Sequence, residues 1–448
     1  GSGGFLLIHI ELMWYNLIIL CDLYRKKGAR IMKNVKHLQC TKCGKTYSAV
    51  PGTYTCTVCG AKAGILDVIY DYDYIAKNYS KESFANNKNY SIWRYEPFLP
   101  TDPNGPKPKL RVGWSPLYKT DKLAEAIGLE TLYMKDDGQN PTASLKDRAS
   151  AIAVAKAAEE KAPLIACSST GNAASSLAGN AASLGIKTCI FVPGRAPAGK
   201  VAQLRIFGAN VISVQGSYNE AFQLSAAAIE KYGWYNRNAA INPYLVEGKK
   251  TATMEVCEQL NWEVPDWVVF SVGDGCTIAG AWKGFLDLYK AGFINKLPKI
   301  AGVQAEGCAP ISKAFHANQP LEPAEENTLA DSIAVGVPRN GEKALRAVRE
   351  SKGTYINVSD EEILSAMRLL GNTSGIFGEP AGVAGLAGLK KLVAEGIIDK
   401  KETVVCAVTG NGLKDVNNAI KAAGEPIKVS PDVDELWSVI ENIPGLLS

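Results

Sequence analysis

The sequence contains only three histidines among its 448 residues. A reactive cysteine needs a base such as histidine beside it, and the sequence offers no such support for Cys276 or Cys308. The scarcity of histidine therefore argues against a cysteine–histidine enzyme.

The sequence also lacks an excess of charge of either sign. Lysine and arginine number 49 and aspartate and glutamate 45, which leaves a net charge of +4. So small an excess gives no electrostatic basis for a nucleic-acid partner. A nucleotide-binding P-loop is missing too, since no G-K-[ST] follows a glycine-rich loop.

Long uninterrupted apolar runs are absent. The run 5–21 is broken by His9, Glu11 and Asn16, and its 17 residues are at the lower limit of a membrane span. It lacks the small-residue cleavage site of a signal peptide. We interpret residues 1–31 as a tag or extension before a natural start at Met32, and we expect no membrane partner. A membrane anchor is the alternative.

The eleven cysteines do not form a disulfide framework, because four lie in one cluster and the other seven are scattered singly. Single cysteines of this kind usually behave as small hydrophobic residues in a reducing compartment. We therefore expect a cytoplasmic location.

From Leu110 onward, apolar runs of strand length alternate with amphipathic helical patterns. This alternation predicts an α/β fold with parallel sheets covered by helices. The predicted strands are 164–168, 188–192, 211–214, 267–272, 300–304 and 404–408. The clearest predicted helices are 150–160, 198–207 and 220–231, with a final surface helix within 431–447.

The cysteine cluster consists of two C-x-x-C pairs twelve residues apart, and its members are Cys40, Cys43, Cys56 and Cys59. Two such turns supply the four thiolates of a tetrahedral structural zinc site, which predicts a zinc ribbon. Glycine follows each pair, at Gly44 and Gly60, where a tight turn needs positive φ. Two redox pairs, or a ribbon that has lost its metal, are the alternatives.

Lys146 lies in the segment Asn140-Pro-Thr-Ala-Ser-Leu-Lys146-Asp-Arg148, which is expected to open a helix capped by Ser144. A lysine near the positive end of a helix loses its proton more easily. A neutral amine is what an attack on an aldehyde requires. The alternative is a solvated lysine beside a solvated Asp147 and Arg148.

Three further segments pair a strand with a turn of small residues. Residues 164–173 contain Ser169, Thr170, Gly171 and Asn172 and suit a carboxylate, because exposed amides and hydroxyls bind anions. Residues 272–280 suit a single phosphate on a helix N-terminus. Thr409 ends a strand at the carboxyl edge of a sheet, where open α/β sheets place their ligands.

A dinucleotide-binding loop is an alternative reading of Gly273 and Gly275. The G-x-G-x-x-G spacing is not met, because position 278 is isoleucine. The acidic residue expected about 20 residues later is not convincingly placed either.

Taken in order, these segments resemble the fold type II pyridoxal-phosphate enzymes, related in fold to the tryptophan synthase β subunit, and among them the threonine synthase family. The resemblance runs from about residue 111 to residue 415. Its motifs are N-P-T-A-S-L-K-D-R, S-S-T-G-N, A-G-K-V-A-Q-L, N-P-Y-L-V-E-G-K-K-T, G-E-P-A-G and T-G-N-G-L-K-D. A zinc ribbon also precedes many family members.

The resemblance implies pyridoxal 5'-phosphate bound as a Schiff base to Lys146, which also moves protons at the substrate's Cα and Cβ. It implies that Asn172 bonds the cofactor's phenolic oxygen and that Thr409 faces the pyridine nitrogen, where a neutral hydroxyl favours elimination and replacement. Ser169, Thr170, Gly171 and Asn172 would bind the substrate. The implied ligands of the cofactor phosphate are Gly273, Asp274, Gly275, Cys276 and Thr277.

The sequence departs from the family where the substrate phosphate is expected to bind. Leu245 stands at the place of the usual arginine, Ala240 near that of a serine, and Asp274 where asparagine is common. Leucine cannot supply the donors that a dianion needs. Arg195, Lys249 and Arg148 are the candidate substitutes.

The resemblance implies a threonine synthase that turns O-phosphohomoserine and water into threonine and phosphate. The alternatives are a serine/threonine dehydratase, an O-phosphoserine-dependent synthase, or a binding protein that has lost catalysis, against which the intact Lys146 argues. The expected division is a zinc ribbon at 32–66, a large domain at 67–149 and 240–448, and a small domain at 150–239. A homodimer is the family expectation.

Overall fold

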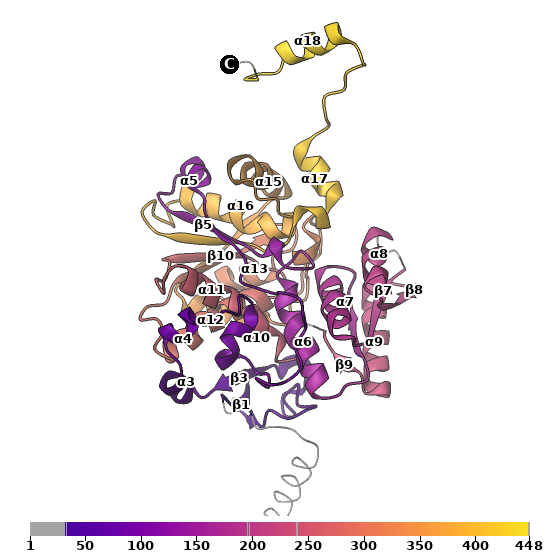
Figure 1. The fold of residues 1–448 in the computed structure, drawn as a ribbon, viewed down its shortest axis with the longest axis vertical. Coiled ribbons are helices and arrows are strands. Elements are labelled where there is room, and N and C mark those ends of the chain that lie inside the picture. The colour runs from indigo at the N-terminus through magenta and orange to yellow at the C-terminus, as the bar shows by residue number, and fades with distance from the viewer. Residues whose placement is uncertain (1–31, 33, 195, 197, 239–240, 447–448) are drawn as a thin grey trace, which may run out of the picture.

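The structure is a computed structural model, and it describes residues 32, 34–194, 196, 198–238 and 241–446 (Figure 1). The extension interpreted at 1–31, Arg195 and Ala240 lie outside the described residues.

The described chain begins with a three-stranded antiparallel sheet in the order β2-β1-β3. Its elements are β1 (Val35–Cys40), β2 (Thr46–Tyr47), β3 (Leu66–Tyr70) and the short helix α2 (Gly60–Ala63). Gly44 and Gly60 adopt φ of 74° and 73°, as predicted for the turns after each cysteine pair. The turns therefore bring the two pairs to one end of this small sheet.

A six-stranded sheet in the order β12-β11-β10-β13-β5-β4 forms the centre of the molecule. Its strands are β4 (Leu117–Lys119), β5 (Leu132–Asp136), β10 (Trp267–Ser271), β11 (Lys299–Ala305), β12 (Thr354–Val358) and β13 (Val404–Val408). All neighbours are parallel except β4, which pairs antiparallel with β5. The expectation of purely parallel sheets is therefore wrong at this edge. The partly exposed β4 can tolerate the change because an edge strand is not enclosed by crossover helices.

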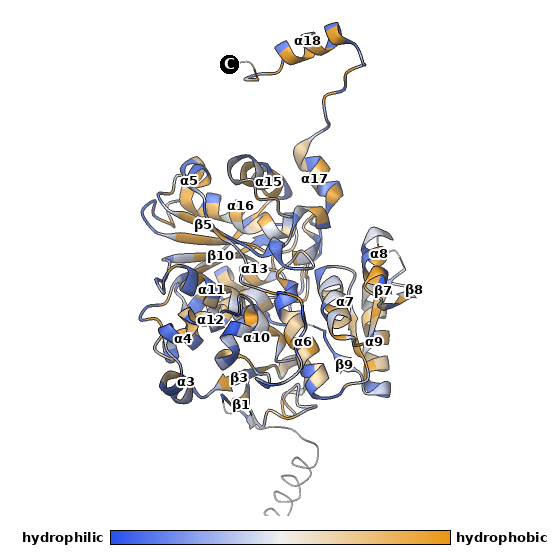
Figure 2. Cartoon of the chain, viewed as in Figure 1, coloured by the Kyte–Doolittle hydropathy of each residue, from blue (hydrophilic) through white to orange (hydrophobic). Residues whose placement is uncertain are grey.

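Alternate side chains of the central strands enter two different cores. Val268 and Phe270 pack with helices α12 (Cys276–Lys290) and α14 (Gly341–Glu350), whereas Val269 packs with α15 (Asp360–Ser374) and α16 (Pro380–Ala394). Strands covered on both faces need apolar residues throughout, and β10 is correspondingly hydrophobic in Figure 2. The helices on the two faces hold the sheet between them, and the carboxyl ends of its parallel strands lie at one edge.

A separate four-stranded parallel sheet has the order β8-β7-β6-β9. Its strands are β6 (Ile165–Ser168), β7 (Thr188–Pro193), β8 (Asn210–Val214) and β9 (Tyr235–Asn236). One face packs on α6 (Lys146–Glu159), α7 (Asn172–Leu184) and α8 (Ala198–Ile206), and the other on α9 (Tyr218–Tyr232). In both sheets the predicted strands form with ends displaced by at most one residue.

The remaining helices connect and cover these layers. They are α3 (Tyr72–Asn78), α4 (Lys81–Ala85), α5 (Asp121–Ile127), α10 (Leu245–Lys249), α11 (Thr251–Gln259), α13 (Pro310–Ala317), α17 (Val416–Ala423) and α18 (Val433–Glu441). The 3-10 helices are η1 (Ile92–Phe98), η2 (Asp137–Gln139), η3 (Asp331–Ile333) and η4 (Gly412–Lys414).

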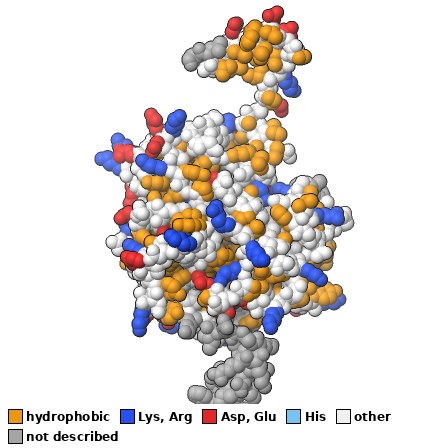
Figure 3. All heavy atoms as spheres, in the orientation of Figure 1, with side chains coloured by type: hydrophobic (Ala, Val, Ile, Leu, Met, Phe, Trp, Pro, Cys, Tyr) orange, Lys and Arg blue, Asp and Glu red, His pale blue; other side chains and the backbone are white. Residues whose placement is uncertain are grey.

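Helix α18 confirms the predicted surface helix near the C-terminus and stands clear of the body (Figure 1). None of its residues is buried. Hydrophobic side chains such as Val433 and Trp437 are more than half exposed, and they gather on the arm in Figure 3. Within the described chain, no helix combines the length and apolar character that crossing a membrane requires.

Candidate active site

Lys146 is the first residue of α6. The predicted cap at Ser144 is wrong, because Leu145 takes the cap position and makes no side-chain bond there. Ser144 Oγ instead accepts a bond from the Lys146 N–H at 3.3 Å. The turn before it includes Ala143 at φ 67°, a conformation that L-residues rarely adopt. The strained turn is held by bonds from Asn411 N to Ala143 O and from Leu145 N to Thr409 O.

The surroundings of the Lys146 amine lower its pKa. Burial and the neighbouring cations Lys249 and Arg237 lower the pKa of Lys146 to about 8. A large fraction of the amine is therefore neutral at mildly alkaline pH. The direction agrees with the prediction from the helix N-terminus, but the causes are burial and the two cations. The alternative of a solvated segment is wrong, since Asp147 and Arg148 are fully buried.

The loop after β10 leads into the N-terminus of α12. A Cβ at Gly273 would meet Ile333 Cα at 2.9 Å, and Gly275 has φ 90°. The Asp274 carboxylate accepts from Arg339 N at 2.8 Å and from Cys276 Sγ at 3.0 Å. The first N–H groups of a helix have no partner within it, so this loop offers donors to an anion.

Asn172 begins α7, directly after the loop from β6. Its Nδ2 donates to Glu379 Oε1 at 2.6 Å, and both residues are buried. Burial raises the pKa of the Glu379 carboxyl to about 7. A Cβ at position 410 would lie 2.0 Å from Glu379 Oε1, so a side chain there would displace the Glu379 carboxylate. The Asn172–Glu379 pair joins the four-stranded part of the molecule to the six-stranded part.

These elements meet in one cavity of about 90 Å³. It brings together all eight residues predicted for the cofactor, since its lining includes Lys146, Asn172, Gly273, Asp274, Gly275, Cys276, Thr277 and Thr409. It adjoins a larger hollow of about 640 Å³, because both are lined by Asn172, Ser332, Glu379 and Ala381. Thr170 and Gly171 line only the larger hollow. Ser169 lines neither, and its Oγ accepts from Gly171 N at 3.2 Å.

The cavity has the features that a pyridoxal phosphate needs. An amine, a helix N-terminus approached through glycines and the neutral hydroxyl residue Thr409 all line it. A phosphate suits the helix N-terminus, and the amine suits an aldehyde. The residues present therefore fit the cofactor.

Two of the expected substitutes for a phosphate-binding arginine behave differently in the fold. Arg148 is not free to bind a substrate, because its guanidinium bonds Asp137 at 2.7 Å and Glu255 at 2.5 Å in the protein interior. Lys249 lines the cavity beside Lys146. Leu245 packs into the apolar core around the four-stranded sheet.

The four clustered cysteines lie at the end of the N-terminal sheet. Their Sγ atoms are all within 4.8 Å of one another. Tyr47 Oη donates to Cys56 Sγ at 3.0 Å, and Cys59 N donates to the same sulfur at 3.4 Å. The geometry is compatible with one metal ion bound by four cysteine sulfurs.

Comparison with known proteins identifies the family. A family model described as pyridoxal-phosphate dependent enzyme matches residues 109–410. The threonine synthase of Methanocaldococcus jannaschii is 41% identical over 408 residues, covering 90% of this chain and 99% of that protein. The threonine synthase of Methanosarcina acetivorans is 42% identical over 407 residues, covering 90% and 98%. The chain belongs to the threonine synthase family of pyridoxal-phosphate-dependent enzymes.

Solved structures share the fold of this chain. The processed form of threonine deaminase isoform 2 from Solanum lycopersicum has a TM-score of 0.60 at 22% identity, covering 69% of this chain and 87% of that one. Maize serine racemase has a TM-score of 0.59 at 21% identity, covering 73% and 91%. At such identities the likeness concerns the fold, which is that of a type II pyridoxal-phosphate enzyme.

Sequence reasoning missed several site residues. Glu379 lies in the G-E-P-A-G motif that supported the family resemblance. In the sequence it is only an acidic residue before a proline that opens a helix, and this pattern predicts no function for it. Arg237 follows the two-residue strand β9, and nothing in its neighbourhood singled it out. Lys414 donates to Ser175 Oγ at 2.9 Å and Gln203 Oε1 at 3.1 Å, across the larger hollow. Only the fold brings these three distant segments together.

Glu379→Gln should make the stability of the cofactor-free protein less sensitive to pH. In the folded chain the carboxyl keeps its proton up to about pH 7, whereas in the unfolded chain it releases it near pH 4.5. Stability contributed by protonated Glu379 is therefore full below pH 4.5 and is lost as the pH rises through 7. The glutamine variant should exceed the parent in unfolding free energy by roughly 1–3 kcal/mol at pH 8, with the gap closing toward pH 5 in urea titrations.

The matched control is Glu361→Gln, because the Glu361 side chain is 80% exposed on α15. That variant should show no pH-dependent gap. A Glu379→Gln effect of equal size at pH 5 and pH 8 would contradict the assigned titration.

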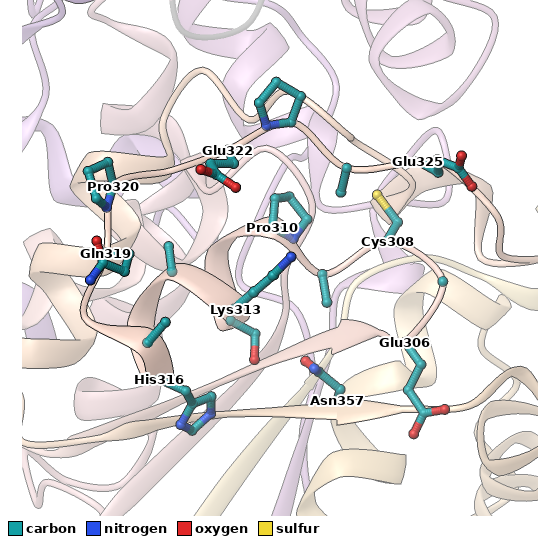
Figure 4. A pocket seen from close by; sticks show the side chains of 17 residues that line it. Glu306, Cys308, Pro310, Lys313, His316, Gln319, Pro320, Glu322, Glu325 and Asn357 are labelled. Atoms are coloured by element: carbon teal, nitrogen blue, oxygen red, sulfur yellow. The ribbon is translucent and has the colours of Figure 1, made fainter.

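A third hollow of about 1090 Å³ lies apart from these residues (Figure 4). It is bounded by α13 and the following loop, and Lys313, His316 and Glu322 are among its lining residues. None of the predicted site residues lines it. It contributes nothing to the arrangement around Lys146.

Proposed function

We propose that this protein converts O-phosphohomoserine and water into threonine and phosphate, with pyridoxal 5'-phosphate held on Lys146. The observation that carries the proposal is the meeting of the low-pKa amine of Lys146 with the N-terminus of α12 in one cavity. The identity to threonine synthases over nearly the whole length of those proteins supports the same substrate.

Different residues around the cavity bind the cofactor and the substrate. We assign the cofactor phosphate to Gly273, Asp274, Gly275, Cys276 and Thr277, the ring nitrogen to Thr409 and the phenolic oxygen to Asn172. The bound cofactor supplies an electron sink for charge that develops on the substrate. The neutral side chain of Thr409 leaves that sink moderate, which favours elimination and replacement.

Lys146 and the loop after β6 act on the substrate itself. Ser169, Thr170, Gly171 and Asn172 precede or begin α7, where the N–H groups of a helix start attract a carboxylate. Lys146 moves protons at Cα and Cβ, for which an amine of pKa about 8 can both donate and accept near neutral pH. The phosphate leaves from Cγ and the water oxygen arrives at Cβ, so water has to be kept out until the phosphate has departed.

Contacts across the larger hollow would help to keep water out, because they connect its two sides. Lys200 on α8 pairs with Asp331 on η3 at 2.9 Å, and Lys414 bonds Gln203 on α8. We propose that the small domain at 150–239 closes on the large domain at 67–149 and 240–448 through these contacts. We further propose a cytoplasmic homodimer, on the family resemblance.

The deciding experiment measures phosphate release from O-phosphohomoserine by the cofactor-loaded enzyme, with amino-acid analysis of the product. Threonine and phosphate in equal amounts are expected. If phosphoserine, serine or threonine is consumed while O-phosphohomoserine is not, the dehydratase or phosphoserine alternative replaces this proposal.

We propose that residues 32–66 form a structural zinc ribbon, with the zinc bound by the four clustered cysteines. Freshly purified protein should contain about one zinc ion per chain, and Cys40→Ser should lose that zinc and unfold at a lower temperature, because structural zinc contributes folding free energy. Metal analysis and thermal unfolding check this. The control Cys308→Ser, at a buried cysteine outside the cluster, should retain the zinc. Protein that contains no zinc as isolated would contradict the proposal.

A further inference from the structure

Most buried cations in the described part of the chain form an ion pair with a carboxylate. Among the described residues, six buried lysines and arginines form an ion pair with aspartate or glutamate, namely Arg94, Lys135, Arg148, Lys156, Lys250 and Lys343. Two buried cations in the same part of the chain have no such partner. They are Arg237 and Lys249, which are 2% and 5% exposed.

Both unpaired cations lie next to Lys146. Lys249 is the last residue of α10 and lines the cavity with Lys146. Arg237 donates from Nε and Nη2 to Ser150 Oγ at 3.1 and 3.0 Å. Ser150 is one helical turn beyond Lys146 on α6, so the two side chains share a face of the helix. Both charges also depress the pKa of Lys146, which agrees with this placement.

An unpaired buried charge costs several kcal/mol, and two like charges together cost more. A hydroxyl such as Ser150 orients the guanidinium but does not neutralise it. The fold therefore places two basic side chains near the reactive amine, and neither forms an ion pair with a carboxylate of the described residues. A bound dianion would remove the cost, and arginine and lysine are the side chains that bind phosphate oxygens.

The cofactor phosphate already has a separate set of donors at the N-terminus of α12. Arg237 approaches Ser150 on α6 from a different element, directly after β9 in the four-stranded sheet, where its N–H bonds Ala166 O at 3.0 Å. That sheet also carries the Ser169–Gly171 loop assigned to the substrate carboxylate. Arg237 is thus associated with the substrate side of the site, whereas Lys249 lines the cavity that also contains the loop before α12.

We propose that Arg237 and Lys249 bind the phosphate group of the substrate and hold the phosphate ion that it releases. This assignment rests on the proposed function, because it takes the substrate to be a phosphate ester. Within that function, the two residues determine specificity for a phosphorylated over an unphosphorylated amino acid.

The test uses cofactor-loaded Lys249→Gln and Arg237→Gln enzymes with three measurements. Steady-state kinetics with O-phosphohomoserine should show KM raised about 10- to 100-fold for each, the loss expected when a hydrogen bond to a charged group is removed. Calorimetry with inorganic phosphate should show affinity weakened by a similar factor. Cofactor content, read from absorbance, should remain one per chain. Lys249→Arg and Arg237→Lys should recover part of the affinity, which a purely structural role would not predict.

The control is Lys290→Gln, at an exposed lysine on α12, which should leave all three measurements unchanged. Unaltered phosphate affinity in both glutamine variants would overturn the proposal. Loss of cofactor from Lys249→Gln with phosphate affinity retained would also overturn it, since Lys249 would then belong to the cofactor phosphate. If Arg237→Gln does not fold, Arg237→Lys and Lys249→Gln still decide the question.

Failure of the proposed function is separable from failure of this inference. Parent enzyme that makes no threonine but binds inorganic phosphate, with binding lost in the two variants, would leave the cation pair as the phosphate site of another substrate. Parent enzyme that makes threonine while the variants behave like it would refute only the cation pair.

Discussion

Replacing Lys146 by alanine should reduce threonine formation by about 10³-fold or more and remove the covalent link to the cofactor. The loss combines the nucleophilic amine with a proton-transfer group that by itself contributes roughly 10²–10⁴-fold. Borohydride reduction followed by mass spectrometry of peptides checks the link. The parent should carry a reduced cofactor on the peptide that contains Lys146, and the variant should carry none.

Lys421→Ala is the matched control, because Lys421 is an exposed lysine on α17. It should retain both the linkage and the activity. A borohydride-stable cofactor on another lysine of the Lys146→Ala protein would show that the reactive amine has been assigned to the wrong residue.

Arg148→Met should destabilise the protein by about 3–5 kcal/mol, the usual effect of removing one member of a buried ion pair. Arg148 bonds Asp137 and Glu255, and also Thr251 Oγ1 at 2.9 Å. Burial opposes ionisation of Glu255, and the charges of Arg148 and Lys135 lower its pKa to about 2, so removing Arg148 leaves a buried carboxylate without its main partner. Urea unfolding of the cofactor-free protein at pH 7.5, followed by tryptophan fluorescence, measures the change.

The comparison variant is Arg346→Met, whose side chain is 45% exposed and pairs with Asp67 at 3.2 Å. An exposed pair contributes about 0–1 kcal/mol. Equal losses of unfolding free energy in the two variants would mean that the buried ion pairs of Arg148 contribute no more stability than an exposed pair.

The sequence predicted six strands of the two larger sheets, because each is a short apolar run bounded by glycine or polar residues. Strand 404–408, for example, is as predicted. Strands β4, β5, β9 and β12 were not among the six. The antiparallel β4 was missed because its three residues carry no pattern that specifies a neighbour or a direction. The cap at Ser144 failed because the chain continues one residue further into the turn, where contacts with Thr409 and Asn411 set the backbone. Those contacts join segments that are far apart in sequence.

The candidate site was predicted where a motif is local and missed where it depends on the fold. Lys146, the loop before α12 and Thr409 each follow a recognisable strand or open a helix. Arg148 looked like a free cation in the sequence, but its carboxylates come from η2 and α11. Glu379 and Arg237 are single residues whose significance comes from Asn172 and Ser150, which the linear sequence does not place beside them.

The chain enters the four-stranded part through α6 and returns through α10, and these two helices touch at their backbones. A Cβ at Gly248 would lie only 2.1 Å from Arg148 O. Because both connecting helices pass through this one contact, we expect the four-stranded part to rotate about it as a hinge rather than slide. Points near the pivot then hardly move, while points far from it travel most. Lys146, two residues from the contact, would keep its position during opening, whereas α8, on the far side in Figure 1, would carry Lys200 away from Asp331.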